Sequence, residues 1–251
     1  MDKNHKVAVV TGAGRGIGAA TAIRLAKDGY DVCVNYVSNK VAADNVVQQA
    51  RSHNVNAISV KADIASEEDV RYLFKEVDSQ LGTLSALVNN AGIIFPQSKL
   101  VDMSADRINS VLSTNVTGSF LCCQQAIKRM SIDHGGAGGV IVNVSSAAAR
   151  IGSPGEYIDY AASKGAIDSL TLGLASEVAA EGIRVNCVRP GFIYTNMHAS
   201  SGEPGRVDRL KNTLPLNRGG QPDEVAAAIA WLISDEASYT CGTFIDLAGG
   251  R

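Results

Sequence analysis

The sequence predicts an α/β fold in which a doubly wound, seven-stranded parallel sheet carries helices on both faces within a single domain, residues 1–251. Patterns typical of strands and helices alternate seven times along the chain, with no internal linker. The first apolar run leads directly into a glycine-rich turn, and polar clusters follow several later strands. Because right-handed crossovers place the carboxyl ends of parallel strands on one edge, these clusters are expected to converge there and bind a ligand.

The first half of the chain shows strand and helix signals in regular succession. Val7–Val10 is continuously apolar, as in a strand buried on both faces. Ser66 is expected to cap a helix, because acidic residues follow it in the first turn, where the helix dipole favours them. In order, the expected elements are a strand at Val7–Val10, a helix from Ile17 to Gly29, a strand at Val32–Asn35, a helix at about Lys40–His53, a strand at Ala57–Val60, a helix after Ser66 and a strand at Leu84–Val88.

The second half continues the alternation with longer connections. Met103–Met130 is predicted to be one long helix with Asn115 in its interior, and Gly135–Gly139 a flexible connection. Residues 193–218 have weak periodicity and are expected to form a lid over a substrate. The other expected elements are a strand at Val140–Val144, a helix at Tyr160–Ala180, a strand at Val185–Val188, a helix at Pro222–Ile233 and a strand at Thr243–Leu247.

The turn after the first strand carries Gly12, Gly14, Gly16 and Gly18. Glycine accepts positive φ and lets a ligand approach the main chain, so such a turn can wrap around a diphosphate at the N-terminus of the next helix. A nucleotide site is therefore the functional interpretation. A purely structural turn, or a site for S-adenosylmethionine or a flavin, would show similar glycines.

Composition argues against several classes of function. The net charge is −2 and the basic residues are scattered, which does not suit a nucleic-acid surface. The five cysteines are odd in number, contain no CxxC pair and lie mostly in apolar runs, as in a reducing compartment. The four histidines have no metal-ligand spacing. The start MDKNHKVAVV has no apolar signal region and no segment is long enough to span a membrane, so we expect a cytoplasmic protein.

Tyr160 and Lys164 are four residues apart in a predicted helix and therefore share a face. A phenol with an ordinary pKa of about 10 is a poor proton donor or acceptor at neutral pH. A nearby ammonium lowers that pKa and makes the phenol a usable general acid/base. Ser145 or Ser146, at the end of a strand, could hydrogen-bond a substrate carbonyl. In the alternative interpretation Tyr160 only packs and Lys164 is solvated.

Taken together, these motifs resemble the short-chain dehydrogenase/reductase family, in its subgroup with one compact domain. The resemblance covers nearly the whole chain and follows the family's order. It implies a Rossmann-type sheet and an oxidoreductase that transfers a hydride between a nicotinamide cofactor and a carbonyl or alcohol. The matching segments are Thr11–Gly18, Asn89-Asn90-Ala91-Gly92, Asn115, Ser145-Ser146, Tyr160-Ala161-Ala162-Ser163-Lys164, and Pro190-Gly191 ahead of Thr195.

The resemblance implies four catalytic residues, Asn115, Ser146, Tyr160 and Lys164. Tyr160 would exchange a proton with the substrate oxygen, and Ser146 would orient the carbonyl. Lys164 would lower the pKa of the tyrosine and bind the nicotinamide ribose. Asn115 would interrupt its helix and expose a main-chain carbonyl that holds a water.

Two neighbouring residues leave alternatives open. The interval from Ser146 to Tyr160 is one residue longer than is usual in the family, so Ser145 remains a rival for the catalytic serine. Tyr157 is rejected as the acid because Ala161 stands where it would need a lysine. We expect Tyr157 to line the substrate pocket, with ordinary packing as the alternative.

The end of the second strand predicts NADP(H) as the preferred cofactor, with NAD(H) possible. Enzymes that prefer NAD carry an acid there, and this chain has Tyr36. Arg15 could reach a 2′-phosphate, assisted by Ser38, Asn39 or Lys40, although it could equally stack on adenine. The implied cofactor-binding residues are Gly12, Gly14, Arg15, Gly16, Ile17, Gly18, Tyr36, Ser38, Asp63, Ile64, Asn89, Ala91, Gly92, Asn115, Tyr160, Lys164, Pro190, Gly191, Ile193 and Thr195.

The lid and the family resemblance bear on substrate and assembly. The lid segment from Asn196 to Asn212 is small and polar, which favours a polar or sugar-like carbonyl, and the chain resembles both acyl-thioester ketoreductases and sugar dehydrogenases. The resemblance also implies a homotetramer, paired through the helices around Asn115 and Tyr160 and through the C-terminal residues 243–251. Two rival functions are a non-catalytic NADP(H)-sensing regulatory protein and a methyltransferase. The second predicts an acid near position 36 and no Tyr/Lys/Ser set, so the sequence speaks against it.

Overall fold

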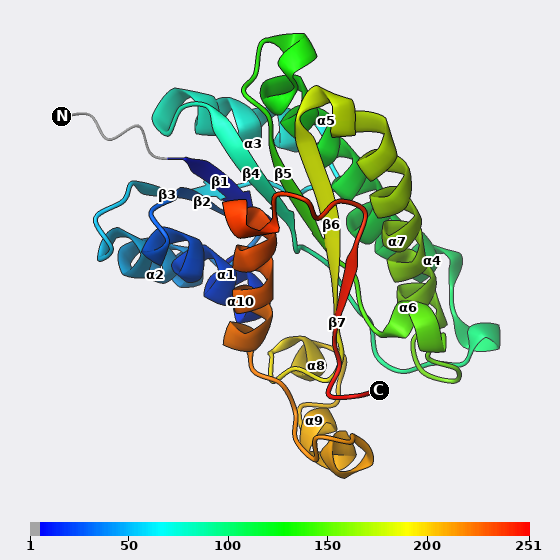
Figure 1. The fold of residues 1–251 in the computed structure, drawn as a ribbon. Helices are drawn as coiled ribbons and strands as arrows, with labels where there is room; N and C mark the ends of the chain where they lie inside the picture. Colours follow the sequence, from blue (N-terminus) through cyan, green and yellow to red (C-terminus); the bar gives the residue numbers. More distant parts are fainter. Residues whose placement is uncertain (1–5) are drawn as a thin grey trace.

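In the computed structural model, which describes residues 6–251, seven parallel strands form one sheet in the order β3-β2-β1-β4-β5-β6-β7 (Figure 1). The predicted doubly wound, seven-stranded parallel sheet is confirmed. The strands are β1 (Val7–Val10), β2 (Asp31–Tyr36), β3 (Ala57–Lys61), β4 (Leu84–Asn89), β5 (Gly139–Val144), β6 (Ile183–Pro190) and β7 (Phe244–Leu247).

Helices cover both faces of the sheet (Figure 1). Helices α1, α2 and α10 pack on one face and α3, α5 and α7 on the other. The α-helices are α1 (Gly16–Lys27), α2 (Lys40–Arg51), α3 (Glu67–Gln80), α4 (Ala105–Leu112), α5 (Gly118–Met130), α6 (Ala148–Ile151), α7 (Ile158–Val178), α8 (Met197–Ser200), α9 (Arg206–Leu210) and α10 (Pro222–Ile233).

Strand β1 shows why the first apolar run is continuous. Ala8 and Val10 face the core under α1, α2 and α10, whereas Val7 and Val9 face the core under α3, α5 and α7. A strand buried on both faces needs an apolar side chain at every position. Within residues 6–251, none of the helices combines the length and the apolar character that crossing a bilayer requires.

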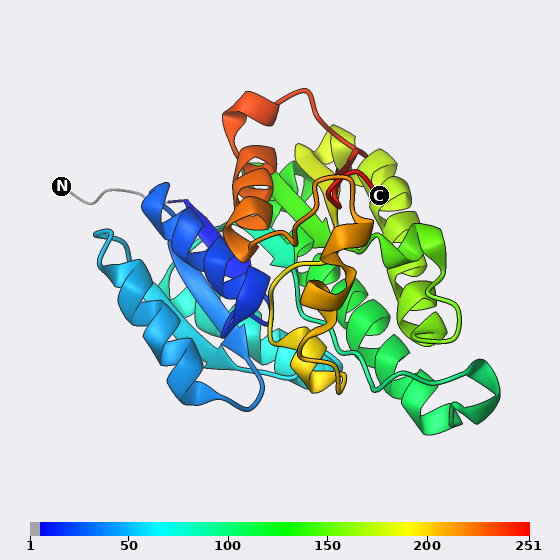
Figure 2. The same cartoon turned by 90° about the horizontal axis from the view of Figure 1, so that it is seen from below.

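The strand order reverses direction at the junction of β1 and β4. Strand β1 pairs with β2 on one side and with β4 on the other. In doubly wound sheets, loops leave this junction in opposite directions and open a crevice beyond the carboxyl edge. Helices α8 and α9 lie beyond this edge, at the bottom of Figure 1. Figure 2, seen from below, shows the yellow and orange segment of α8 and α9 extending across it.

The region predicted as one long helix from Met103 to Met130 is divided. Helix α4 starts only at Ala105, because the Ser104 hydroxyl caps it by accepting from the Arg107 N–H at 3.2 Å. A π-helical turn, Ser113–Thr117, then separates α4 from α5. The predicted helix is therefore wrong as a continuous α-helix, although its interruption falls at Asn115, as the family resemblance implies.

Two other connections differ from expectation. The Gly135–Gly139 segment, expected to be flexible, is tied back by hydrogen bonds from Gly136 N to Ser131 O at 2.8 Å and from Gly138 N to Met130 O at 2.7 Å. The weakly periodic segment 193–218 contains the short helices α8 and α9, and the loop after β5 contains α6. Four or five residues are too few for a helical period to be detected in a sequence.

Candidate active site

The glycine turn fits close approach of a ligand to the main chain. Gly12 has φ of 61°, and a Cβ there would lie 2.9 Å from Ala91 Cα. A Cβ at Gly18 would lie 2.7 Å from Gly12 O, so α1 begins tightly against the turn. Arg15, at the N-cap of α1, makes no capping hydrogen bond with its side chain. The free N–H groups and positive dipole of this helix end suit an anionic group such as a diphosphate.

Asn90, which was not among the predicted site residues, holds the glycine turn in place. Its Nδ2 donates to Thr11 O at 2.9 Å and to Gly12 O at 3.2 Å, and its main-chain N–H donates to Thr11 Oγ1 at 3.0 Å. The signal was its position directly after a strand, beside the predicted Asn89. The Asn89 side chain instead lies in the core, where it donates to Asn143 Oδ1 at 3.0 Å. The structure does not bring the Asn89 side chain to the cavity described below.

The end of β2 has donors but no acid. Tyr36 is buried, and Arg15 and Ser38 are exposed, with no side-chain hydrogen bond or ion pair to any other described residue. The other two expected donors are engaged: Asn39 caps α2 by accepting from Ala42 N at 3.0 Å, and Lys40 pairs with Asp44 at 2.6 Å. Arg15 and Ser38 are therefore the groups at this strand end that remain able to bind a further anion.

Asp63 and Ile64 follow β3 on the same edge of the sheet. Asp63 is exposed, and its Oδ1 accepts from Ala65 N at 3.0 Å. Ile64 is buried and packs with the core under α3 and α5. Asp63 also borders an open polar hollow formed with Asp106 and Ser110 of α4. Asp63 and Ile64 thus continue the carboxyl edge beyond β2.

Helix α7 places Tyr160 and Lys164 on one face toward the sheet. Lys164 is 4% exposed, so its ammonium depends on protein partners. Its Nζ donates to Val144 O at 2.8 Å and lies 5.6 Å from the centroid of the Tyr160 ring. A Cβ built on Gly92 would be 3.6 Å from this Nζ, so the loop after β4 also meets Lys164. The alternative of a solvated Lys164 is wrong.

Burial changes the titration of both groups. It lowers the pKa of Lys164 to about 8, because the charged form loses its hydration. It raises the pKa of Tyr160 to about 12, and a hydrogen bond with the Ser146 hydroxyl opposes this rise. The sequence had suggested that the ammonium lowers the tyrosine pKa. In this structure burial is the main cause of the Tyr160 shift, and the Lys164 Nζ donates to the Val144 carbonyl.

The two serines after β5 have different surroundings. The buried Ser145 hydroxyl donates to Lys164 O at 3.0 Å and so ties α7 to the sheet. Ser146 is half-buried, accepts from Ala148 N at 3.1 Å and hydrogen-bonds Tyr160. Of the two hydroxyls, that of Ser146 is the one that interacts with Tyr160, and α6 lies in the loop between them.

Asn115 lies at the π-helical turn and is 1% exposed. Its Oδ1 accepts from Ile93 N at 2.8 Å, and its Nδ2 donates to Ile93 O and to Ser163 Oγ, both at 3.0 Å. The Asn115 main-chain carbonyl accepts from Ser119 Oγ at 3.1 Å. Asn115 thus joins the loop after β4 to the helix that carries Lys164.

A cavity of about 460 Å³ lies at the carboxyl edge and brings the central residues together. Of the predicted site residues, those that line it are Ile17, Ser146, Tyr160, Lys164, Pro190, Gly191, Ile193 and Thr195. Those outside its lining are Gly12, Gly14, Arg15, Gly16, Gly18, Tyr36, Ser38, Asp63, Ile64, Asn89, Ala91, Gly92 and Asn115. The second group follows the edge from the cavity past β1 toward β3, as an extended ligand would.

The half of the cavity that the loops after β4, β5 and β6 form, which we call the substrate half, has an apolar composition that the sequence did not predict. Tyr157 lines it, in agreement with its expected place, and is joined by apolar side chains from the three loops after β4, β5 and β6. The polar appearance of the lid is misleading, because Met197 and Leu210 turn into the cavity. The apolar lining residues in this half include Ile94, Ile151, Pro154, Phe192, Met197 and Leu210.

His198 in the lid behaves as a structural residue. Its Nε2 lies 3.2 Å from Ile193 O, and burial lowers its pKa. Within residues 6–251, no group of three or more His, Cys, Asp or Glu side chains is arranged to hold a metal ion. Besides Tyr160, Lys164 and the serines, the titratable side chains that line the cavity are Glu156, Tyr157, His198, Arg206 and Arg251.

The sequence is similar to those of reductases along its whole length. Residues 12–251 match the family model described as enoyl-(acyl carrier protein) reductase. An uncharacterized oxidoreductase of Escherichia coli K12, YgfF, is 61% identical over 245 residues, which cover 98% of this chain and 99% of that protein. The 3-oxoacyl-(acyl-carrier-protein) reductase FabG of Staphylococcus aureus is 39% identical over 248 residues, covering 99% of this chain and 98% of that protein.

Solved structures show the same likeness. A short-chain dehydrogenase from Burkholderia cenocepacia J2315, in complex with NADP, is 35% identical with a TM-score of 0.88, covering 98% of this chain and 97% of that one. A short-chain type dehydrogenase/reductase from Mycobacterium marinum is 31% identical with a TM-score of 0.90, covering 97% and 94%. The similarity therefore extends from the glycine turn to the C-terminal strand.

Proposed function

This chain belongs to the short-chain dehydrogenase/reductase family, and from its site we propose that it is an NADP(H)-dependent carbonyl reductase with Tyr160 as general acid/base. One observation carries the proposal. Tyr160, Ser146 and Lys164 line one cavity together with Ile17 and Thr195, which lie beside the glycine turn. A cofactor seated along the glycine turn would therefore reach the chamber in which these three side chains meet.

Each residue has a role that follows from its surroundings. The cofactor, when bound, supplies or accepts the hydride. With a pKa of about 12, Tyr160 carries its proton at neutral pH, and we propose that this proton passes to the substrate oxygen. Ser146, which hydrogen-bonds Tyr160, would orient the substrate carbonyl.

Lys164 and Asn115 would support the proton donor. The family resemblance implies that Lys164 binds the nicotinamide ribose, and its buried ammonium lies beside Gly92 in the loop after β4. Asn115 fixes the loop after β4 against α7 through Ile93 and Ser163. Its main-chain carbonyl, as the family resemblance implies, would hold a water. The remaining predicted cofactor residues would hold the dinucleotide along the carboxyl edge.

The preference for NADP(H) is supported by the end of β2. Tyr36 stands where an acid would select NAD, and both Arg15 and Ser38 are free to meet a 2′-phosphate. The similar structure from Burkholderia cenocepacia contains NADP. NAD(H) is the weaker alternative, because the ribose alone would leave Arg15 without an anionic partner.

The cavity supports a compact carbonyl substrate with an apolar flank. Its apolar residues, Ile94, Ile151 and Phe192 among them, surround the side opposite the glycine turn. The apolar lining favours an apolar group on the substrate, whereas the lid sequence favours a polar or sugar-like carbonyl, and the substrate panel distinguishes the two. A 3-oxoacyl compound, the class named for the Staphylococcus aureus relative, has the required carbonyl and an apolar chain. No observation favours a non-catalytic regulatory protein, since Tyr160 and Lys164 are both present and adjacent.

We also propose a homotetramer that works in the cytoplasm. The five cysteines, all within the described residues, are free thiols, which suits a reducing compartment. Helices α4, α5 and α7, which the family resemblance places at an interface, each expose a large apolar side chain. These are Leu112, Phe120 and Leu172.

The test is a panel of carbonyl compounds followed at the nicotinamide absorbance band with NADPH and with NADH. The panel should contain short 3-oxoacyl thioesters, compact ketones, aldehydes and oxidised sugars. We expect reduction of 3-oxoacyl or compact ketone substrates, faster with NADPH. Silence across the panel with intact NADPH binding would favour the regulatory alternative, and better rates with NADH would contradict the cofactor assignment.

A further inference from the structure

Arg206, the first residue of α9, is a buried cation in the wall of the cavity. Its residue is 6% exposed, and it lines the cavity together with Tyr157 and Phe192. A guanidinium cannot lose its charge, so burial requires charged or hydrogen-bonding partners. Specific contacts therefore hold Arg206 in the cavity wall, and these contacts have no part in the proposed proton transfer.

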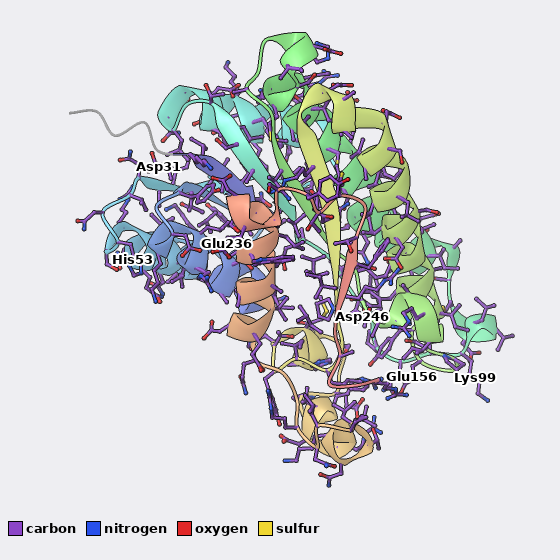
Figure 3. All side chains as sticks on the ribbon, in the orientation of Figure 1. Asp31, His53, Lys99, Glu156, Glu236 and Asp246 are labelled. Atoms are coloured by element: carbon purple, nitrogen blue, oxygen red, sulfur yellow. The ribbon has the colours of Figure 1, made fainter. Side chains whose placement is uncertain are left out.

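Two carboxylates from different segments satisfy the guanidinium. Glu156, in the loop after β5, accepts from Nη1 at 3.1 Å and is also in contact with Nη2. Glu203, between α8 and α9, accepts from Nη1 at 2.8 Å. Figure 3 labels Glu156 at the lower end of the molecule, close to the segment that carries α9. Arg206 thus fastens the lid to the loop that leads into α7 and Tyr160.

A third segment joins the same cluster. Gln97, in the loop after β4, donates through Nε2 to Glu203 Oε2 at 2.8 Å and approaches Glu156 Oε1 at 3.4 Å. The loops after β4, β5 and β6 therefore meet at one guanidinium and its two carboxylates. These three loops supply the substrate half of the cavity, whereas Ile17 lines it next to the glycine turn.

Arg206 also orders the aromatic wall of this half. Its guanidinium carbon lies 5.0 Å from the centroid of the Tyr157 ring and 5.6 Å from that of Phe192. Both distances are within the range of cation–π attraction. Tyr157 is held further by its hydroxyl, which donates to Ser201 Oγ in the lid at 3.4 Å. Arg206 is thus the cation that contacts both rings, whereas Arg251 contacts the Phe192 ring alone, at 5.6 Å from its centroid.

We propose that Arg206 is a positioning and specificity-determining residue that sets the shape of the substrate half of the cavity. This proposal rests on the proposed function, because it assigns Arg206 to the binding of the same carbonyl substrate. The planar guanidinium of Arg206 contacts two carboxylates and two aromatic rings at once, which a lysine ammonium cannot do. Loss of this guanidinium releases the lid and both aromatic rings together and leaves the glycine turn in place.

The experiment compares Arg206→Met with Arg206→Lys and with Arg209→Met as the matched control. Arg209 lies on the same helix and pairs with the same Glu203 at 2.5 Å, but it does not line the cavity. For the substrate found in the panel, Arg206→Met should raise KM by about tenfold or more. Arg206→Lys should fall between this variant and the wild type. Arg209→Met should keep KM within about twofold of the wild-type value, as for an exposed ion pair.

Further measurements separate positioning from general loss of structure. The Kd for NADPH, measured by fluorescence, should stay within about twofold in every variant. Hydrogen exchange of the free protein should be faster across residues 193–213 in Arg206→Met than in Arg209→Met. If Arg206→Met does not fold, Glu156→Gln keeps the proposal testable, because it weakens the Arg206 cluster without touching Arg209. Its KM should rise in the same direction.

Two outcomes would overturn the inference. One is a KM for folded Arg206→Met, or for Glu156→Gln in its place, that matches the Arg209→Met value. The other is equal hydrogen exchange across residues 193–213 in the Arg206→Met and Arg209→Met proteins. A wild-type protein that turns over no carbonyl would instead contradict the proposed function, and the exchange comparison would still decide whether Arg206 holds the lid.

Discussion

At the scale of single residues, burial rather than proximity sets the chemistry of the site. Tyr160 and Lys164 lie one helical turn apart, as the YxxxK spacing predicts, yet the ammonium is directed to Val144 O. That direction has no signal in the sequence, because it depends on where β5 ends beside α7. The sequence predicted that Tyr160 and Lys164 lie together, but it did not predict the pKa values of the two side chains.

The shifted pKa values predict a definite pH dependence. Both Lys164 and Tyr160 are proposed to act in their protonated forms, with pKa values of about 8 and about 12. As pH rises, Lys164 loses its proton first. The kcat/KM for carbonyl reduction should therefore be level near neutral pH and fall by about tenfold per pH unit above about 8. A pH–rate profile that stays level for about two further pH units would contradict this assignment.

The same Lys164 shift affects stability, with a sign that can be checked. Its pKa falls from 10.5 in the unfolded chain to about 8 in the folded protein. Between these values the unfolded chain binds more protons, so the contribution of Lys164 to the free energy of unfolding rises with pH in this window. Chemical denaturation of the wild type and of Lys164→Met across the window measures this contribution. The opposite slope in the difference would contradict the burial of the ammonium.

Arg15 carries the prediction of cofactor preference. Arg15→Ala should raise the Kd for NADPH by about tenfold or more and change the Kd for NADH much less, because only NADPH has a 2′-phosphate. Fluorescence titration with both cofactors measures the difference. Arg24→Ala is the control, since Arg24 lies on the same helix and pairs with Asp28. Equal losses for the two cofactors would assign Arg15 to adenine stacking instead.

At the scale of elements, strands were more predictable than helix interruptions. The strands were located from their apolar runs because both faces of the sheet are covered. The π-helical turn between α4 and α5 depends on Ile93, 22 residues before Asn115 in the sequence, whose main chain bonds the Asn115 side chain. The lid shows the same limit, because Met197 and Leu210 contribute to a cavity whose other walls come from distant loops. Such features depend on tertiary contacts that periodicity does not record.

The hydrogen bonds of the Asn115 side chain should stabilise the fold as well as the site. Asn115→Ala removes three hydrogen bonds, one buried and two part-buried, and leaves polar groups of Ile93 unsatisfied. We expect the free energy of unfolding to fall by about 1–3 kcal/mol. The matched control is Asn109→Ala on the exposed side of α4, with an expected change of about 0.5 kcal/mol or less. Urea unfolding measures both, and equal effects would contradict the structural role of Asn115.

At the scale of the whole molecule, the sheet, the cavity and the family membership agree, whereas assembly remains a prediction. Light scattering should give the mass of a tetramer. Phe120→Glu combined with Leu172→Glu should reduce that mass, because both apolar side chains are exposed on helices proposed to pair between subunits. Val41→Glu, at an exposed apolar residue of α2, is the control and should leave the tetramer intact. A monomeric wild type would contradict the proposed assembly.

The catalytic use of Tyr160 can be tested most directly by comparing NADPH binding and carbonyl turnover in Tyr160→Phe and in the wild type. Phenylalanine keeps the ring and removes only the hydroxyl. We predict that turnover falls by about 10²- to 10⁴-fold, because the proton donor is lost. The Kd for NADPH should stay within about threefold, because the glycine turn is untouched. Turnover close to the wild-type rate in a folded, NADPH-binding Tyr160→Phe protein would contradict the role assigned to this tyrosine.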